Sequence, residues 1–261
     1  MILAFDIGNS SIKAAIFNDD RLARHFRYPA GSPADFDYEV TAADIAGVFA
    51  EIKADPAVSH ELPTAIAVSS VVPALKSVLR QAAQENFDLQ PWFFDHKAKL
   101  GIKILTENPD QVGVDRLAGA LAAKTRFGAP VITVDLGTAT TFNVVDYNGN
   151  FAGGVIAPGI ATSASALFKK AAKLFPVDIA RPERCLGKNT GESLQAGIFY
   201  GAIGQIDGIL VRLIEEIGAR ELPIVATGGL VEIIAPYCKY IKHISKYLNL
   251  EGVKLAYERA G

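Results

Sequence analysis

Asp6-Ile7-Gly8-Asn9-Ser10 and Asp135-Leu136-Gly137-Thr138-Ala139-Thr140-Thr141 are two versions of one motif, placed half a chain apart. Each follows an apolar run, Ile2-Leu3-Ala4-Phe5 or Val131-Ile132-Thr133-Val134, and each leads into another β-rich segment. A carboxylate at a strand end can hold a hydrated cation, and a glycine beside it lets backbone N–H groups approach phosphate oxygens. We therefore predict two similar turns that grip a nucleoside triphosphate and its metal from two sides.

The segments after the two turns follow the same order of strands and helices. The expected strands are Ile2–Asp6, Ser11–Phe17, Leu22–Tyr28, Ala65–Val71, Pro91–His96, Val131–Asp135, Thr141–Tyr147, Phe151–Ile156, Ile224–Ala226 and Tyr240–Ile244. The expected helices include Leu117–Arg126, Ser163–Leu174, Gly191–Ile217 and Leu248–Arg259. Two β-β-β-α-β-α-β-α halves, residues 1–115 and 116–261, predict an α/β fold made by duplication.

Composition narrows the class of protein. Half of the 261 residues are hydrophobic, 21% are charged and the net charge is −2, so the chain can bury large cores. Lys and Arg are scattered, which argues against nucleic acid as a partner. The apolar start stops at Asp6 and no uncharged apolar run approaches about 18 residues, so we expect neither a signal peptide nor a membrane partner. With only Cys185 and Cys238, far apart, we expect a soluble cytoplasmic protein without zinc or disulfides.

The first turn carries a candidate metal and phosphate site. A single Asp-x-Gly is common in tight turns, but two copies in matching hairpins favour a function for Asp6. We predict that Asp6 binds Mg²⁺ through water, and that Gly8, Asn9 and Ser10 donate hydrogen bonds to phosphate oxygens. Lys13 either points at the same site or lies solvated on the outer face of the hairpin, and the sequence leaves both open.

The second turn offers matching groups. Taken alone, the position of Asp135 indicates a second carboxylate for Mg²⁺, and Thr138 can donate hydrogen bonds to a phosphate from its N–H and its hydroxyl. Thr227-Gly228-Gly229 follows a strand and precedes a helix, so its glycines would let adenosine lie against the backbone. A simple strand-to-helix turn is the alternative.

Gly113-Val114-Asp115-Arg116 opens a helix and leaves two interpretations of Asp115 open. Asp115 either caps the helix or accepts a proton from an attacking hydroxyl, while the donors of Arg116 would hold an acidic substrate. Asn189 and Glu192 read as a helix-capping box. No role is assigned to the histidines, which are His25, His60, His96 and His243.

Taken together, these segments resemble the type III pantothenate kinases, in family order over nearly the whole chain. Besides the two Asp-x-Gly turns, the matching pieces are Ser69-Ser70-Val71-Val72-Pro73, Asn108-Pro109 through Gly113-Val114-Asp115-Arg116, Gly153-Gly154-Val155-Ile156-Ala157-Pro158-Gly159, Gly187-Lys188-Asn189-Thr190, Ala226-Thr227-Gly228-Gly229-Leu230 and Leu248-Asn249-Leu250-Glu251-Gly252. No single piece is specific, but the ordered set is.

The resemblance implies a fold and an activity. The fold is the duplicated ribonuclease H-like, actin-like ATPase fold shared with hexokinases and heat-shock ATPases, with two domains around a nucleotide cleft. The activity is ATP-dependent phosphorylation of the terminal (4′) hydroxyl of pantothenate, the first step of coenzyme A biosynthesis. The resemblance also implies Mg²⁺, a monovalent cation (K⁺ or NH₄⁺) and a homodimer with pantothenate near the subunit interface.

It also implies roles for individual residues. Asp115 would be the proton acceptor, and Asp135 would bind the monovalent cation, which replaces its interpretation as a second Mg²⁺ carboxylate. The residues implied for ATP are Asp6, Ile7, Gly8, Asn9, Ser10, Ser11, Ile12, Lys13 and Thr138. Those implied for pantothenate are Thr106, Gly113, Val114, Asp115, Arg116 and Thr190.

Three departures from the family pattern and two rival functions qualify these expectations. Ser10 replaces the usual threonine, Thr106 stands where many members carry a tyrosine, and the segment Phe168–Arg184 follows the family only loosely. The rivals are another small-molecule kinase or phosphatase of the same fold, and a nucleotide-binding regulatory protein without transfer activity. Asp6, Asp115 and Asp135 together argue against loss of transfer.

Overall fold

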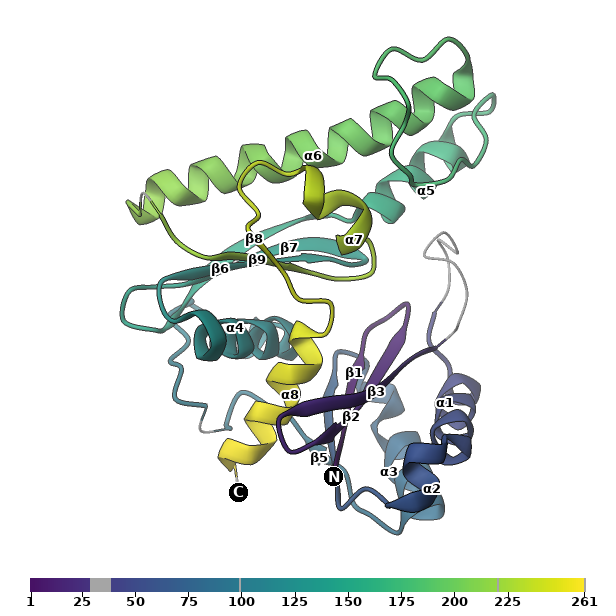
Figure 1. Ribbon diagram of the computed structural model, residues 1–261, viewed down its shortest axis with the longest axis vertical. Coiled ribbons are helices and arrows are strands. Elements are labelled where there is room, and N and C mark those ends of the chain that lie inside the picture. The colour runs from purple at the N-terminus through teal and green to yellow at the C-terminus, as the bar shows by residue number, and fades with distance from the viewer. Residues whose placement is uncertain (29–38, 99, 220, 261) are drawn as a thin grey trace. The chain divides into compact units, whose positions relative to one another are not determined.

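The chain forms two compact units. The computed structural model describes residues 1–28, 39–98, 100–219 and 221–260, and Figure 1 traces them. The first unit contains residues 1–28, 39–98, 100–125 and 248–260, and the second contains 126–219 and 221–247. This division differs from a single boundary between residues 115 and 116. Most of helix α4 (Val114–Phe127) stays with the first unit, and the C-terminal helix α8 (Leu248–Ala260) returns to it.

Each unit contains a five-stranded sheet, and the two sheets have the same topology. The order is β3-β2-β1-β4-β5 in the first unit and, read from the opposite edge, β8-β7-β6-β9-β10 in the second. The strands are β1 Ile2–Ile7, β2 Ile12–Asn18, β3 Arg21–Tyr28, β4 Ala65–Ser70, β5 Trp92–Phe93, β6 Val131–Leu136, β7 Ala139–Val145, β8 Phe151–Pro158, β9 Ile224–Thr227 and β10 His243–Ile244. In both sheets the first strand pairs antiparallel with the second and parallel with the fourth. The predicted duplication is confirmed.

The first sheet buries both faces, but with different side chains. One face carries large residues such as Leu3 and Phe5, which pack with helices α1 (Ala42–Ala54) and α3 (Lys76–Phe87), and Phe5 stacks on Phe49 with ring centroids 5.2 Å apart. The other face carries small residues at register positions. These are Ala4, Ala15 and Ala67, all fully buried. Alanines let α8 lie close to β1, β2 and β4.

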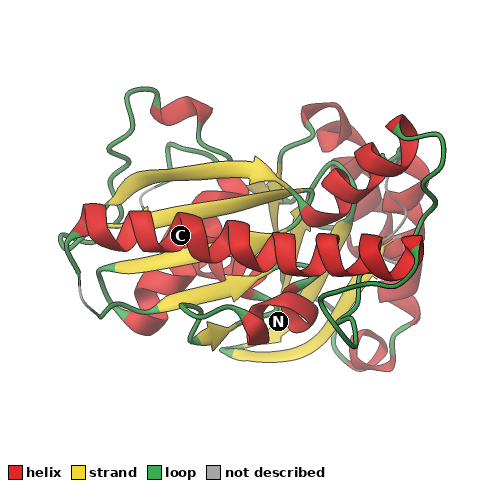
Figure 2. Ribbon diagram, turned by 90° about the horizontal axis from the view of Figure 1, so that it is seen from above, coloured by secondary structure: helices red, strands yellow, loops and turns green. Residues whose placement is uncertain are grey.

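The second sheet is covered by the longest helix of the described chain. Helix α6 (Thr190–Ile217) runs along the strands, as Figure 2 shows. Its buried side chains recur at helical spacing, as Phe199, Ala202, Ile206 and Leu210 do, and they join the core of β6, β7 and β9. Gly218 ends α6 in the left-handed conformation, with φ 71°. Helices α5 (Ile160–Lys170) and α7 (Val231–Ile234) belong to the same unit.

One of the two contacts of the predicted capping box of α6 is confirmed. The side chain of Asn189 accepts a hydrogen bond from the Glu192 N–H at 2.9 Å. In a reciprocal capping box, Glu192 would accept the N–H of the cap residue. Here Glu192 instead accepts the backbone N–H of Lys188 at 2.9 Å and the side-chain amide of Asn189.

Several predicted elements have different bounds in the structure, among them β10, which is His243–Ile244 instead of Tyr240–Ile244. Strand β5 is confined to Trp92–Phe93, because the Asp95 side chain accepts the Lys97 N–H and turns the chain out of the sheet. Helix α5 begins at Ile160 rather than at Ser163, because Gly159 ends β8 tightly and takes the N-cap position.

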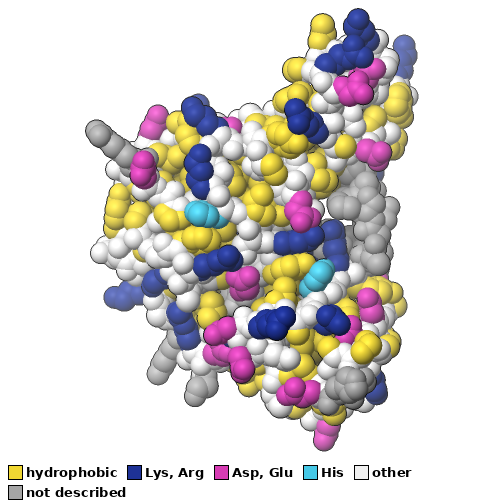
Figure 3. All heavy atoms as spheres, viewed as in Figure 1, with side chains coloured by type: hydrophobic (Ala, Val, Ile, Leu, Met, Phe, Trp, Pro, Cys, Tyr) yellow, Lys and Arg dark blue, Asp and Glu magenta, His cyan; other side chains and the backbone are white. Residues whose placement is uncertain are grey.

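The described residues show mixed surface charge and one strongly apolar helix. On the face shown in Figure 3, Lys and Arg side chains alternate with acidic ones. Helix α6 alone has the length and hydropathy of a membrane span (18-residue window, mean hydropathy 1.4), and 22% of that window is buried. Asp207, inside this helix, accepts the Lys239 N–H through both carboxylate oxygens at 3.0 Å. The helix is thereby tied to its own unit.

Candidate functional site

The carboxylate of Asp6 lies in a polar cluster on the first sheet. Asp6 is 5% exposed, and its Oδ2 lies 3.6 Å from Lys13 Nζ and 3.5 Å from Asn249 Nδ2. Lys13 is the cross-strand partner of Asp6, and Ser69 is its neighbour on β4. The side chain of Lys13 therefore turns toward Asp6, which settles the orientation that the sequence left open.

In the turn after β1, the backbone rather than the apolar side chains is exposed. The Gly8 N–H donates to the Ser11 carbonyl at 3.0 Å and closes the turn, while the Asn9 carbonyl accepts the Val40 N–H at 2.8 Å. Ile7 and Ile12 are 1% and 0% exposed, so their side chains belong to the core. Only their backbone is available to a ligand. Gly8, Asn9, Ser10 and Ser11 are all at least partly exposed, and the Gly8 N–H is already used to close the turn.

The surroundings of Asp6 fit a hydrated cation. The Ser69 hydroxyl is completely buried beside Asp6, and no described residue accepts or donates a hydrogen bond to it. A buried polar group of this kind needs a partner, which a water molecule can supply. A carboxylate next to a hydroxyl that requires water suits a magnesium ion that keeps its own waters.

The carboxylate of Asp135 lies against two glycines in the second unit. A methyl group on Gly228, whose φ is +103°, would lie 2.6 Å from Asp135 Oδ1, and one on Gly137 would lie 3.4 Å away. Thr227 is the neighbour of Asp135 on β9. Within the described residues, no three His, Cys, Asp or Glu side chains gather as a metal site. Asp135 is thus a single carboxylate beside close backbone atoms.

The turn after β6 is held by the start of α5. The Thr138 carbonyl accepts the Gly159 N–H at 3.1 Å and the Thr162 hydroxyl at 2.7 Å. A methyl group on Gly159 would overlap this carbonyl and that of Gly137, so only glycine fits at the N-cap of α5. The side chain of Thr138 is exposed next to this helix start. Its predicted phosphate contact thus has an accessible hydroxyl.

Asp115 lies in the first turn of α4, and its carboxylate folds back over Gly113. A methyl group on Gly113 would overlap Asp115 Oδ1, so a larger residue there would displace this carboxylate. The Arg116 and Leu117 N–H groups donate to the Gly113 carbonyl at 3.1 Å and 3.2 Å. Burial lowers the pKa of the Arg116 guanidinium, and the charge of Asp115 opposes this shift. The position suits a helix cap and an accessible carboxylate equally.

One residue near Asp115 escaped the sequence interpretation. The ring of His96, to which no role was assigned, lies with Nε2 2.6 Å from the Val112 carbonyl. His96 therefore anchors the loop that leads into Gly113 and Asp115. The signal in the sequence was too weak to find it, because a single histidine after a short strand has no characteristic pattern.

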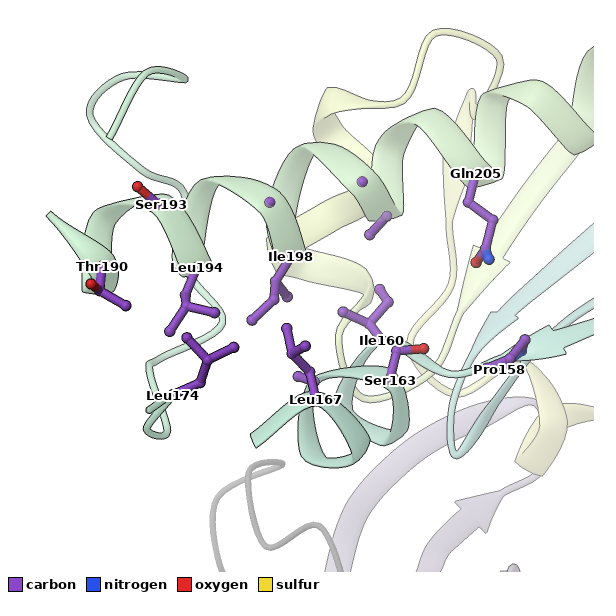
Figure 4. Close-up of a pocket in the computed structure, with 14 residues that line it drawn as sticks. Pro158, Ile160, Ser163, Leu167, Leu174, Thr190, Ser193, Leu194, Ile198 and Gln205 are labelled. Atoms are coloured by element: carbon purple, nitrogen blue, oxygen red, sulfur yellow. The ribbon is translucent and has the colours of Figure 1, made fainter. Parts of the chain in front are cut away.

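The two threonines implied for pantothenate lie in different units. The Thr106 hydroxyl, in the first unit, is buried without a hydrogen-bond partner among the described residues. Thr190, in the second, opens α6 and lines a cavity of about 460 Å³ between α5 and α6. Figure 4 shows Leu167 and Leu174 facing Leu194 and Ile198 across this cavity. The cavity is mainly apolar, with Thr190 at one end.

Comparison with known proteins agrees with these observations. A family model described as type III pantothenate kinase matches residues 2–212. Curated relatives named type III pantothenate kinase include one from Citrifermentans bemidjiense, 39% identical over 99% of both chains, and one from Myxococcus xanthus, 40% identical over 99% of this chain and 98% of that one.

Solved structures show likeness of fold. One is described as a conserved putative Baf family transcriptional activator from Campylobacter jejuni, with TM-score 0.57, 21% identity and coverage of 98% and 97% of the two chains. Another is an activator of 2-hydroxyisocaproyl-CoA dehydratase from Clostridium difficile with bound ADPNP, with TM-score 0.52, 11% identity and coverage of 99% and 95%. The predicted duplicated, actin-like α/β fold is confirmed.

Proposed function

The chain belongs to the type III pantothenate kinase family, and we propose that it transfers a phosphoryl group from ATP to the terminal (4′) hydroxyl of pantothenate. This is the first step of coenzyme A biosynthesis. The observation that carries the proposal is the match to family relatives along the entire chain, both Asp-x-Gly turns included. A kinase for a sugar of the same fold would share the turns but has no need for the Gly113–Arg116 segment.

The two turns are proposed to hold ATP. The backbone donors of Asn9 to Ser11, in the turn that Gly8 opens, the Lys13 ammonium and the Thr138 hydroxyl would bind phosphate oxygens. Asp6 would hold Mg²⁺ through water, and the ion, when bound, neutralises phosphate charge. The contact of Lys13 with Asp6 supports this arrangement, because it keeps the Lys13 ammonium group beside the turn after β1.

Pantothenate is proposed to lie against the start of α4. Asp115 would accept the proton of the 4′ hydroxyl, and Arg116 would bind the carboxylate of pantothenate with its planar set of donors. Gly113, Val114 and Thr106 would line the pantothenate pocket, and Thr190 would contact pantothenate too. Phosphoryl transfer needs mainly positioning and charge neutralisation, so one well-placed base is sufficient.

The test of this function is an assay of ADP release. We expect the purified protein to form ADP from ATP only when pantothenate is present, because the proton acceptor needs an acceptor hydroxyl beside it. Parallel reactions with glucose, N-acetylmannosamine and acetate are the controls. ADP formation at the same rate without any acceptor would indicate an ATPase, and a rate specific to a sugar would indicate a different kinase.

Asp135 is proposed to bind a monovalent cation, K⁺ or NH₄⁺. The support is the position of its Oδ1 against Gly137 and Gly228, where backbone oxygens can approach an ion that a side chain would exclude. When bound, such an ion offsets phosphate charge near the second turn.

A homodimer is proposed from the exposed face of α6. Gly197, Gly201 and Gly204 lie on this face, and a methyl group on any of them would meet nothing in the described chain. Each glycine costs a helix about 1 kcal/mol relative to alanine. Gly197 and Gly201 also line the cavity between α5 and α6, whereas Gly204 is not among its lining residues. Between Glu192 and Arg212 the helix has a single charge, at Asp207. A second copy packed closely on this face accounts for both features.

The mass in solution tests the dimer. Light scattering behind a sizing column is expected to give twice the chain mass of 27.8 kDa. A mass of one chain at micromolar concentration would contradict the proposal. Because ATP is the phosphoryl donor, we also propose that the protein works in the cytoplasm.

A further inference from the structure

Asn249 makes a contact with Asp6 that the sequence interpretation did not identify. Asn249 is the second residue of α8 and lies 243 positions from Asp6 in the chain, yet its Nδ2 donates to Asp6 Oδ2 at 3.5 Å. Its side chain is buried, with the residue 7% exposed. The amide and the Lys13 ammonium approach the same carboxylate oxygen, from α8 and from β2.

Two glycines bring Asn249 to this position. A methyl group on Gly252 would overlap the backbone of Ala118, so α8 and α4 touch backbone to backbone. A methyl group on Gly119 would lie 2.7 Å from Asn249 Oδ1. The amide is thus confined, with its oxygen toward Gly119 on α4 and its nitrogen toward Asp6 on β1.

The surrounding face shows why this polar contact is not part of ordinary packing. On the face of β1, β2 and β4 under α8, the middle positions are Ala4, Ala15 and Ala67, and the polar residues of this face, Asp6, Lys13 and Ser69, stand together at one end. Burying an amide costs free energy unless it is hydrogen-bonded, so an apolar residue would serve packing at least as well. An amide at this point has a use if the orientation of the Asp6 carboxylate matters.

We infer that Asn249 is a positioning residue that fixes the carboxylate of Asp6 for the magnesium–nucleotide complex. The inference rests on the proposed role of Asp6 in nucleotide binding. The amide donates to Oδ2 without bringing a charge, so it orients the carboxylate but leaves its negative charge for the hydrated cation. Loss of this donor therefore weakens binding of the magnesium–nucleotide complex and leaves the pantothenate pocket unaffected.

The experiment measures equilibrium binding, not only turnover. A non-hydrolysable ATP analogue is titrated by calorimetry into the full-length Asn249→Ala and Asn249→Asp variants, at several Mg²⁺ concentrations. We expect the affinity for the analogue to fall about tenfold for Asn249→Ala, because one hydrogen bond to a charged group is lost. We expect a larger fall for Asn249→Asp, because the new carboxylate would repel that of Asp6. The KM for pantothenate should remain at the wild-type value.

Two more variants separate positioning from stability. Gly119→Ala keeps the Asn249 amide but displaces its oxygen, so this variant should show the same loss of Mg²⁺-dependent nucleotide affinity. If the Asn249 variants do not fold, Gly119→Ala alone tests the positioning role. Asn86→Ala, in α3, removes an amide that donates to the Ala82 carbonyl, and should leave nucleotide binding unchanged.

A lower melting temperature of Asn249→Ala with wild-type affinity at every Mg²⁺ concentration would overturn the inference. The proposed function has a separate outcome. If the wild-type protein binds the magnesium–nucleotide complex but does not phosphorylate pantothenate, the proposed substrate is wrong, while the comparison of affinities still tests Asn249.

Discussion

Asp115→Asn is expected to lower turnover by about 10²–10⁴-fold, the contribution of a positioned general base, with ATP affinity unchanged. The amide that replaces the carboxylate cannot accept the proton of the pantothenate hydroxyl. Asp115 lies at the start of α4, whereas the proposed phosphate donors lie in the turns after β1 and β6. Steady-state rates of ADP release and calorimetric ATP binding check the two halves of this prediction.

Asparagine also separates the two interpretations of Asp115. Asparagine and aspartate stabilise helix starts about equally, so a residue that only caps α4 would tolerate the exchange in both rate and melting temperature. Near-normal turnover would therefore show that Asp115 is a cap. Asp110→Asn, an exposed carboxylate in the loop just before α4, is the matched control and should retain full activity.

Replacing K⁺ and NH₄⁺ by Na⁺ is expected to lower the rate about tenfold or more, because a fixed electrostatic contact near developing phosphate charge contributes up to about 10²–10³-fold. A rigid arrangement of oxygens suits the larger ions and fits Na⁺ poorly. ADP release is measured at constant ionic strength with each chloride salt. Equal rates in all three salts would contradict the role proposed for Asp135.

Gly228→Ala tests the position of that cation site. The added methyl group would lie 2.6 Å from Asp135 Oδ1 and from the backbone N and C of Leu136, so the carboxylate and the end of β6 must move and the difference between K⁺ and Na⁺ should disappear. Gly128→Ala is the matched control, because Gly128 also has a positive φ, +81°, but its methyl group would contact nothing. A variant at Gly228 that keeps the full K⁺ response would place the cation elsewhere.

Much of this molecule could be predicted from local sequence. The apolar runs before Asp6 and Asp135 define β1 and β6, and a repeated run predicts a repeated sheet, because strand pairing follows from neighbouring segments. The side chain of Asn189 defines the start of α6 by accepting the N–H of Glu192, which is only three residues away in the sequence. The family was also evident from sequence, because its motifs occur in order.

The sequence alone therefore determined the duplication, the order of elements and the two acidic turns. Tertiary structure decided where α8 belongs, since this helix of the second half packs on the first sheet and carries Asn249 to Asp6. The anchoring of the Asp115 loop by His96 is of the same kind. These contacts depend on how closely two backbones approach, above all at Gly119 and Gly252. Distances between segments remote in sequence produce no periodic pattern of residues, so they could not be predicted from the sequence.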